Sequence, residues 1–395
     1  MVPAIISGVN GTTELSVVMP CLNEADTVGA CVTKAVQALA AHNVAGEVIV
    51  ADNGSTDGSQ AIASAAGARV VSVTGRGYGS ALMGGIAAAR GRFILMGDAD
   101  DSYDFGELPK FLTLLRNGAE LVQGCRLETG GGTVMAGAMR PLHQWWGNPM
   151  FSWMARTWFR APIHDVHCGL RAFTTDLYDR LQLRCTGMEF ASEMVIKASL
   201  GQARIAEVPI TLYPDGRRGR TSHLRTFRDG WRHLSFYLIY SPRWLFLAPG
   251  LLLVAFGVLG YLVAMPKMQF GGVTFDVNTL LFASLAFICG YQSIVFAVLT
   301  KVFATVEGLL PPDPRVDWLG RVMGLERGLA IGAVLCVLGP ALLLGAIEQW
   351  RARQFGPLDY EQTLRWVIPG VTLTVLGVQT VLASFYLRIL QLARR

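Results

Sequence analysis

The chain has 395 residues, of which 52% are hydrophobic and only 16% carry a charge. This composition excludes an ordinary soluble protein, in which about a quarter of the residues are charged, and it predicts that part of the chain lies in lipid. The net charge of +5 is ordinary for a membrane protein with basic inner loops, so it gives no indication of a nucleic-acid partner.

Up to about Tyr240, short β-branched runs alternate with segments of helical spacing. The predicted order is strand 15–20, helix 23–42 with Asn23 as N-cap, strand 47–52, helix 59–67, strand 69–73, helix 79–90 and strand 92–98. Such alternation predicts an α/β domain with a mostly parallel, Rossmann-like sheet. Its ligand crevice is expected at the carboxyl ends of the strands.

Polar clusters follow each of the four predicted strands. They are Pro20 with Asn23 and Glu24, then 52–57, then 76–80, and finally 98–101. Turn chemistry alone could explain the cluster DNGSTDGS, but four clusters on one sheet edge favour a ligand site. The stretch TGRGYGSAL lacks the glycine spacing of a dinucleotide fold and the lysine of a P-loop, although a helix start beside Arg76 can still bind a phosphate.

The fourth strand ends in several carboxylates, among which Asp98 and Asp100 alternate by one residue. A solvated loop could hold them, and so could a cation. A hard divalent ion takes oxygen ligands and is often held by one or two carboxylates together with substrate phosphates. The pair therefore favours Mg²⁺ or Mn²⁺ bound together with a diphosphate.

Beyond Tyr240, four apolar runs approach the length needed to cross a membrane, at 244–264, 279–299, 328–347 and 367–390. Buried helices of a large soluble core are the alternative. Basic residues near the span ends predict, by the positive-inside rule, an inner or plasma membrane protein with both termini inside. Residues 1–223 would then form a cytosolic domain, since the N-terminus lacks the features of a secretory signal.

Residues 224–242 mix arginines with Phe227 and Trp231 at helical spacing. This pattern predicts a helix in the membrane interface, with its arginines at the lipid headgroups. A helix that packs on the domain core is the simpler alternative. The membrane domain would then comprise residues 243–395.

The motifs VVMPCLNEADTV, VIVADNGSTDGS, GRGYGSALMGGIAAARGRFILMGDADDSY and DVHCGLRAF occur in this order. As a set they resemble the inverting family-two glycosyltransferases, particularly the branch of dolichyl-phosphate mannose and glucose synthases and bacterial polyprenyl-phosphate hexosyltransferases. The resemblance spans roughly 15–242. It implies a GT-A type nucleotide-sugar-binding domain followed by the four membrane helices.

The resemblance also implies roles for individual residues at the donor end of the site. Nucleotide binding falls to Pro20, Asn23, Glu24, Asp52, Arg76 and Asp98, and metal binding to Asp98 and Asp100. The family often has Asp-Asp-Gly-Ser after the second strand. Here Asn53 takes the second position, so Asp52 is the only carboxylate at these two positions.

The acceptor end is expected to hold a lipid phosphate. The cationic and hydroxyl candidates for that phosphate are Arg126, Arg171, Arg217, Arg218, Arg220 and Ser222. Asp165 belongs to the motif DxxCG, and Glu193 is either the family's acidic residue near the sugar or a carboxylate on a helix surface. A phosphate is already ionised near neutral pH, so Asp98, Asp100 and Arg126 can suffice for catalysis without a strong base.

The sequence therefore predicts a membrane-bound transferase that moves one hexose, with glucose or mannose favoured, from a UDP- or GDP-sugar to a polyprenyl phosphate such as undecaprenyl or dolichyl phosphate. Homo-oligomerisation is open. A processive polysaccharide synthase is the rival enzyme, because QTLRW at 362–366 matches its Gln-x-x-Arg-Trp signature. A non-catalytic membrane scaffold is the alternative from another class.

Overall fold

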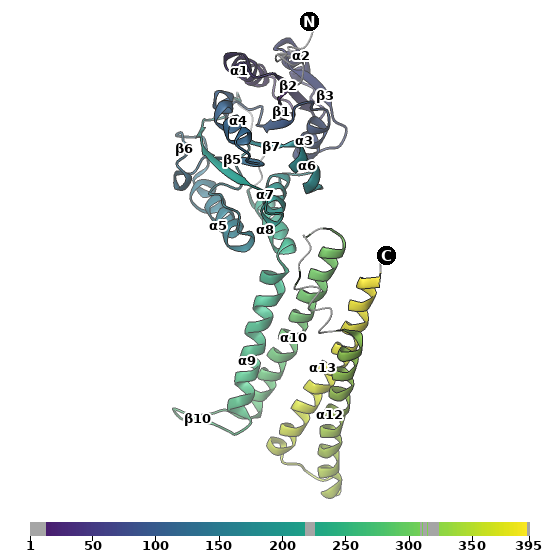
Figure 1. The fold of residues 1–395 in the computed structure, drawn as a ribbon. Helices are drawn as coiled ribbons and strands as arrows, with labels where there is room; N and C mark the ends of the chain where they lie inside the picture. The colour runs from purple at the N-terminus through teal and green to yellow at the C-terminus, as the bar shows by residue number, and fades with distance from the viewer. Residues whose placement is uncertain (1–12, 218–225, 309, 311–313, 315–323, 393–395) are drawn as a thin grey trace. The chain divides into compact units, whose positions relative to one another are not determined.

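The computed structural model describes residues 13–217, 226–308, 310, 314 and 324–392. It divides into two compact units, Met1–Phe236 and Tyr237–Arg395. The first unit holds the α/β domain and the second holds the long apolar helices (Figure 1). The division falls inside α8 (Thr226–Tyr240).

The first unit is built on a seven-stranded sheet with the order β3-β2-β1-β4-β7-β5-β8. Its strands are β1 (Leu15–Cys21), β2 (Gly46–Asp52), β3 (Arg69–Ser72), β4 (Phe93–Met96), β5 (Leu121–Cys125), β7 (Arg171–Thr174) and β8 (Ile205–Pro209). β7 runs antiparallel to both of its neighbours, and the other pairs are parallel. A mostly parallel sheet is thereby confirmed.

Helices pack against this sheet and against one another. They are α1 (Val28–Ala41), α2 (Ser59–Ala65), α3 (Tyr78–Ala87), α4 (Leu108–Arg116), α5 (Asn148–Phe159), α6 (Thr175–Leu181) and α7 (Phe190–Leu200). Every residue of β2 and β4 is buried, as expected for parallel strands that are covered on both faces. A second small pairing joins β6 (Thr133–Val134) to β9 (Thr211–Leu212).

The first helix begins later than predicted. α1 starts at Val28 with Thr27 as its N-cap, whereas Asn23 has a positive φ of 58°. The Asn23 carboxamide accepts a hydrogen bond from Thr56 N at 2.8 Å. The N-cap prediction for Asn23 is therefore wrong, because this side chain joins two strand-end loops instead of starting a helix.

The second unit consists mainly of α9 (Ala248–Ala264), α10 (Val277–Val306), α12 (Leu325–Ala352) and α13 (Tyr360–Leu392). A π-helical turn at Arg243–Leu247 precedes α9, and a hairpin of β10 (Gln269–Phe270) and β11 (Val273–Thr274) connects α9 to α10. These helices, with the π-helical turn included in the first, are four candidate membrane spans by length and composition. The four predicted runs lie inside them.

Glycines bring these helices together in pairs. A methyl group added at Gly290 of α10 would lie 2.7 Å from the Gly250 carbonyl oxygen of α9. One added at Gly377 of α13 would lie 3.0 Å from the Gly332 carbonyl oxygen of α12. Small residues allow such close backbone approach, which replaces the hydrophobic driving force that is missing between helices in lipid.

Candidate functional site

Two cavities open on the sheet domain at the carboxyl ends of its parallel strands. The strand-end cavity, of about 970 Å³, is bordered by the loops after β1, β2, β3 and β4. The helix-walled cavity, of about 710 Å³, is bordered on one side by η3 (His143–Gly147), α5 and α8. Both are lined by Tyr78, Asp98, Asp100, Met188 and Arg217. The two cavities therefore meet at the predicted metal-binding carboxylates.

Asp98 and Asp100 are half-buried at this meeting point. Tyr78 Oη donates to Asp98 Oδ1 at 2.9 Å, and the Ser102 hydroxyl donates to Asp100 Oδ1 at 2.6 Å. Loss of solvent, followed by the negative charge of Asp100, raises the pKa of Asp98 to about 7. Two neighbouring carboxylates repel each other, and a bound cation would relieve this repulsion. They also offer the hard oxygen atoms that Mg²⁺ and Mn²⁺ prefer.

The described residues include no group of three or more His, Cys, Asp or Glu side chains arranged to hold a metal ion. A metal at Asp98 and Asp100 would therefore need further ligands from a bound molecule. The phosphate oxygens of a substrate are the usual source of such ligands. The donor set thus fits a divalent ion that binds together with a phosphorylated ligand.

Asp52 lies at the end of β2 and lines the strand-end cavity. Its carboxylate accepts hydrogen bonds from the backbone N–H groups of Gly54 and Ser55 and from the Gln60 amide. Burial raises the pKa of Asp52, but the hydrogen bonds from Ser55 and Gln60 outweigh it and leave the pKa below its usual value. Asp52 is therefore ionised, and its carboxylate is already engaged in hydrogen bonds within its own turn.

Asn53 connects two strand-end loops. Its amide nitrogen donates to the carbonyl oxygens of Val73 and Gly75, and its Oδ1 accepts from the Gly77 N–H at 2.9 Å. A carboxylate could accept from Gly77 but could donate to neither carbonyl. This geometry gives a physical reason for asparagine at the position where the family often has aspartate.

Glu24 and Arg217 were predicted to act at opposite ends of the site, but they form one pair. Arg217 Nε donates to Glu24 Oε2 at 2.8 Å and Nη2 donates to Oε1 at 2.6 Å. Arg217 Nη2 also lies 3.6 Å from Asp100 Oδ2, and Nη1 lies 3.6 Å from Asp215 Oδ2. Arg217 thus neutralises the carboxylates that surround the junction of the two cavities.

Arg126 and Asp165 form a second bidentate pair at the wall of the helix-walled cavity. Arg126 Nε lies 2.7 Å from Asp165 Oδ2 and Nη2 lies 2.9 Å from Oδ1. The Asp165 carboxylate is fully buried. Arg126 Nη1 lies 3.5 Å from the Tyr103 hydroxyl, which accepts a hydrogen bond from the Gly169 N–H. Asp165 therefore acts through Arg126 and fixes its orientation.

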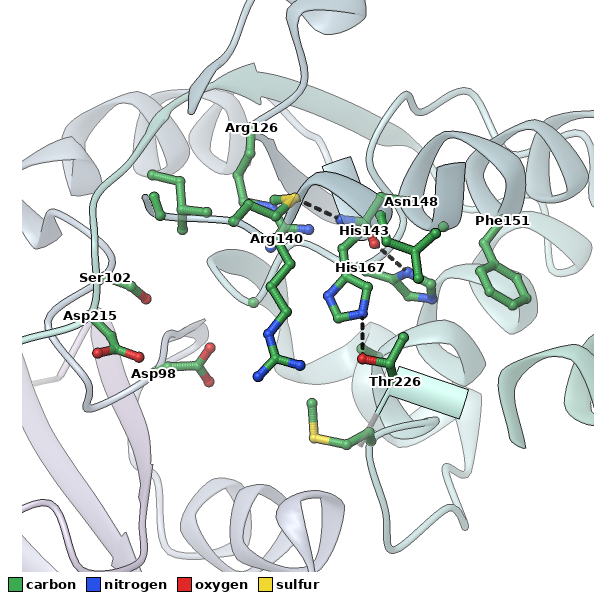
Figure 2. A pocket seen from close by; sticks show the side chains of 18 of the residues that line it. Asp98, Ser102, Arg126, Arg140, His143, Asn148, Phe151, His167, Asp215 and Thr226 are labelled. Carbon is green, nitrogen blue, oxygen red and sulfur yellow. Dashed lines mark hydrogen bonds between the residues drawn. The ribbon is translucent and has the colours of Figure 1, made fainter. Parts of the chain in front are cut away.

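Arg140 lines the helix-walled cavity but is not among the residues predicted from the sequence. It is exposed and points into the helix-walled cavity (Figure 2). Within the described part of the chain, no acceptor is recorded for its guanidinium group, in contrast to Arg126 and Arg217. The sequence signal for it was weak, because Arg140 is a single basic residue in the connection between β6 and η3 and belongs to none of the motifs.

Histidines form the far wall of the helix-walled cavity. His143 Nε2 lies 3.1 Å from the Thr226 hydroxyl, and His167 Nδ1 lies 3.0 Å from Asn148 Oδ1 (Figure 2). Burial, followed by the charges of His233 and Arg126, holds the pKa of His167 well below its usual value. His167 is therefore neutral. Since its Nδ1 faces an amide oxygen, Nδ1 carries the proton and Nε2 is left as an acceptor.

Apolar side chains complete this cavity and continue onto the surface. Leu142, Trp146 and Met150 line it and are 52%, 73% and 44% exposed. Trp145 and Trp153, from the same two helical segments, are also exposed. A contiguous exposed patch of this kind marks a contact with a lipid or another apolar partner.

Arg171 and Glu193 are among the predicted site residues that line neither cavity. Arg171 is fully buried, and its guanidinium donates to the carbonyl oxygens of Val166, Cys168 and Ala191. This position does not fit an acceptor-phosphate ligand, and Arg171 instead ties the DxxCG loop to α7. Glu193 is also fully buried, not on a helix surface, and accepts from the N–H groups of Arg184 and Cys185.

The remaining predicted residues divide by position. Pro20 and Arg76 line the strand-end cavity. Asn23 is not among its lining residues and instead supports the loop that carries Thr56. Arg218, Arg220 and Ser222 lie outside the described residues.

Comparison with known proteins gives two family matches. The model "Glycosyl transferase family 2" matches residues 16–181, and "Glycosyltransferase family 2 C-terminal transmembrane region" matches residues 298–391. The low-salt glycan biosynthesis hexosyltransferase Agl6 of Haloferax volcanii is 38% identical over 94% of this chain and 88% of its own length. A dolichyl-phosphate hexose transferase of the same organism is 31% identical over 55% of this chain and 89% of its own length.

Two solved structures are similar to part of this chain at lower identity. Glucosyl-3-phosphoglycerate synthase from Mycobacterium tuberculosis, in complex with Mn²⁺, UDP and glucosyl-3-phosphoglycerate, is 23% identical over 55% of this chain and 76% of its own. The TM-score is 0.42. A structure described as a mycobacterial protein is 27% identical over 56% of this chain and 72% of its own, with a TM-score of 0.43.

Proposed function

Because the chain belongs to glycosyltransferase family 2, we propose that it transfers one hexose from a UDP- or GDP-sugar to a polyprenyl phosphate. It is a membrane-associated hexosyltransferase of this family. The proposal also places the reaction at the cytosolic leaflet and makes it inverting. The observation that carries it is the meeting, at Asp98 and Asp100, of a strand-end cavity lined by many charged side chains and a second cavity with an exposed apolar rim.

The strand-end cavity would hold the nucleotide sugar. Its polar residues surround the ends of four parallel strands, where open α/β sheets bind nucleotides. Asp98 and Asp100 would hold a divalent ion, Mg²⁺ or Mn²⁺, together with the diphosphate. When bound, this ion neutralises charge on the leaving diphosphate.

The helix-walled cavity would hold the acceptor. Its apolar rim of Leu142, Trp146 and Met150 suits the first isoprene units, and Arg140 suits the phosphate. Arg126, fixed by Asp165, lies at the same wall. This one cavity therefore offers both features that a lipid phosphate needs, namely a cation for its phosphate and apolar side chains for its hydrocarbon chain.

The reaction needs no strong base. An oxygen of the ionised acceptor phosphate attacks the anomeric carbon and forms the new C–O bond. The bond from that carbon to the β-phosphate oxygen breaks, and its electron pair leaves with the nucleoside diphosphate. Arg217, the arginine that lines both cavities, would stabilise the charge that develops on the leaving group. No proton has to move.

The synthase alternative finds no support. Gln362–Trp366 forms part of the first turns of α13, and Arg365 Nη1 donates to the carbonyl oxygens of Ala264 and Met265. Ala264 ends α9, so the motif contacts the C-terminal end of α9. In the proposed orientation, with both termini inside, this end of α13 faces outside, whereas the processive signature acts on the cytosolic side. The scaffold alternative conflicts with the family membership and with the intact site.

The test offers purified full-length protein in detergent a panel of radiolabelled UDP- and GDP-hexoses. Undecaprenyl phosphate and dolichyl phosphate serve as acceptors, with Mg²⁺, Mn²⁺ or a chelator present. Label in a single acid-labile lipid product, lost with chelator, is the expected result. Label in a long water-soluble polymer would support the synthase instead, and no turnover with any donor would refute the proposal.

A further inference from the structure

Three arginines line the strand-end cavity without a recorded acceptor among the described residues. Arg76 follows β3, and Arg228 and Arg232 come from α8. All three are exposed. The sequence pattern predicted that the α8 arginines contact lipid headgroups, but the structure places both of them in the wall of this cavity.

The charges of the cavity favour an anionic ligand at these arginines. The Asp52 carboxylate is occupied by its own turn, and the Glu24 carboxylate is paired with Arg217. Of the lining carboxylates this leaves Asp98 and Asp100, which a divalent ion would neutralise. Three guanidinium groups then remain to face a ligand, and guanidinium groups match phosphate oxygens in geometry and charge.

α8 carries the two arginines on one face, because residues four apart lie one above the other on a helix. Other residues of the helix, Thr226 and His233, line the helix-walled cavity. His233 Nδ1 lies 3.0 Å from the Ser192 hydroxyl, and its ring centroid lies 4.4 Å from that of His167. α8 is therefore anchored on the domain and borders both cavities.

We propose that Arg228 and Arg232 bind the diphosphate of the nucleotide sugar and stabilise it as it leaves. This inference rests on the proposed function and adds α8 to its donor site. A nucleotide sugar carries about two negative charges on its diphosphate, and the released nucleoside diphosphate carries about three at neutral pH. Arginines beside this group interact more strongly with the leaving group than with the bound donor, which favours transfer.

The experiment measures binding of UDP, GDP, UMP and GMP to the full-length protein in detergent with Mg²⁺, by isothermal titration calorimetry. The variants are Arg228→Gln, Arg232→Gln and the double variant. Arg90→Gln is the matched control, since Arg90 is exposed and precedes β4 at the opposite edge of the sheet. Arg232→Lys tests whether charge alone restores binding.

We expect each single variant to weaken binding of the preferred nucleoside diphosphate about 10-fold and the double variant about 100-fold, the usual effect of lost charged hydrogen bonds. Binding of the monophosphate should change less than 2-fold. Arg232→Lys should recover part of the loss, and Arg90→Gln should bind like the unchanged protein. Circular dichroism and thermal unfolding establish that each variant is folded.

Two results would overturn the inference while the proposed function survives. One is a folded double variant that binds the diphosphate as tightly as the unchanged protein. The other is equal weakening of monophosphate and diphosphate binding, which would assign α8 to the nucleoside. If the unchanged protein binds no nucleoside diphosphate at all, the proposed function fails and the inference fails with it.

Discussion

Gly169 packs directly against Asp98, and this contact makes Gly169→Ala a sharp test of the site. A methyl group added at Gly169 would lie 2.7 Å from Asp98 Oδ2 and 3.1 Å from the Tyr103 hydroxyl oxygen. Ordinary non-bonded contacts begin at about 3.4 Å, so one group must move by about 0.7 Å. Tyr103 is buried and hydrogen-bonded to Gly169 N. Asp98 is therefore the group that moves.

A displacement of this size at a reacting centre costs up to about 100-fold in rate. We expect kcat/KM of Gly169→Ala to fall about 10- to 100-fold with a hexose donor and polyprenyl phosphate. The free energy of unfolding should fall by only about 1–3 kcal/mol, the usual cost of an added methyl group in a packed site. The affinity for Mg²⁺ should weaken in parallel, because Asp98 is a proposed ligand.

The assay compares initial rates over a range of metal concentrations, with thermal unfolding measured on the same samples. Gly345→Ala in α12 is the control, because no atom lies within 4 Å of its added methyl group. It should keep full activity. A Gly169→Ala variant with unchanged rate and unchanged metal dependence would refute the placement of Asp98 at the reacting centre.

Four further predictions follow from the same geometry. Asp100→Ala should lower transfer by at least about 1000-fold and remove metal dependence while the protein stays folded; full activity would refute the metal assignment. Asp165→Ala should destabilise the protein by about 3–5 kcal/mol, since it leaves the Arg126 charge buried without its partner, and an unchanged unfolding temperature would contradict this. Trp146→Ala should raise KM about 10-fold for a long-chain polyprenyl phosphate but not for a short, soluble prenyl phosphate; equal effects on both would argue against an apolar path. Truncation after Pro242 should keep nucleotide binding in calorimetry and impair transfer to long-chain lipid, whereas unchanged lipid kinetics would exclude a role for the apolar helices.

The family resemblance and the fold were both predictable from the sequence and are confirmed. β-branched runs mark β1 to β4 because buried parallel strands need continuous apolar residues. The long helices were visible because a membrane span requires about 20 apolar residues. The antiparallel direction of β7 was not visible, since its four residues carry no signal that distinguishes strand direction.

The site was only partly predictable, because its key contacts join residues far apart in the chain. Glu24 and Arg217 are separated by 193 positions, and no local sequence pattern predicts that they form a pair. Arg171 was predicted as a ligand of the acceptor phosphate because that phosphate needs a cation, and its three carbonyl partners appear only in the fold. Arg140 was overlooked for the opposite reason, since a single exposed arginine carries no pattern of its own.

Asn53 limits how the loops of the strand-end cavity can be exchanged between relatives. Its three hydrogen bonds couple the loop after β2 to the loop before α3. Replacing it with the aspartate often found in the family would set a carboxylate against the carbonyl oxygens of Val73 and Gly75. Grafting a relative's loop after β2 into this chain therefore requires that the loop before α3 be exchanged with it, so the two loops form one transferable module.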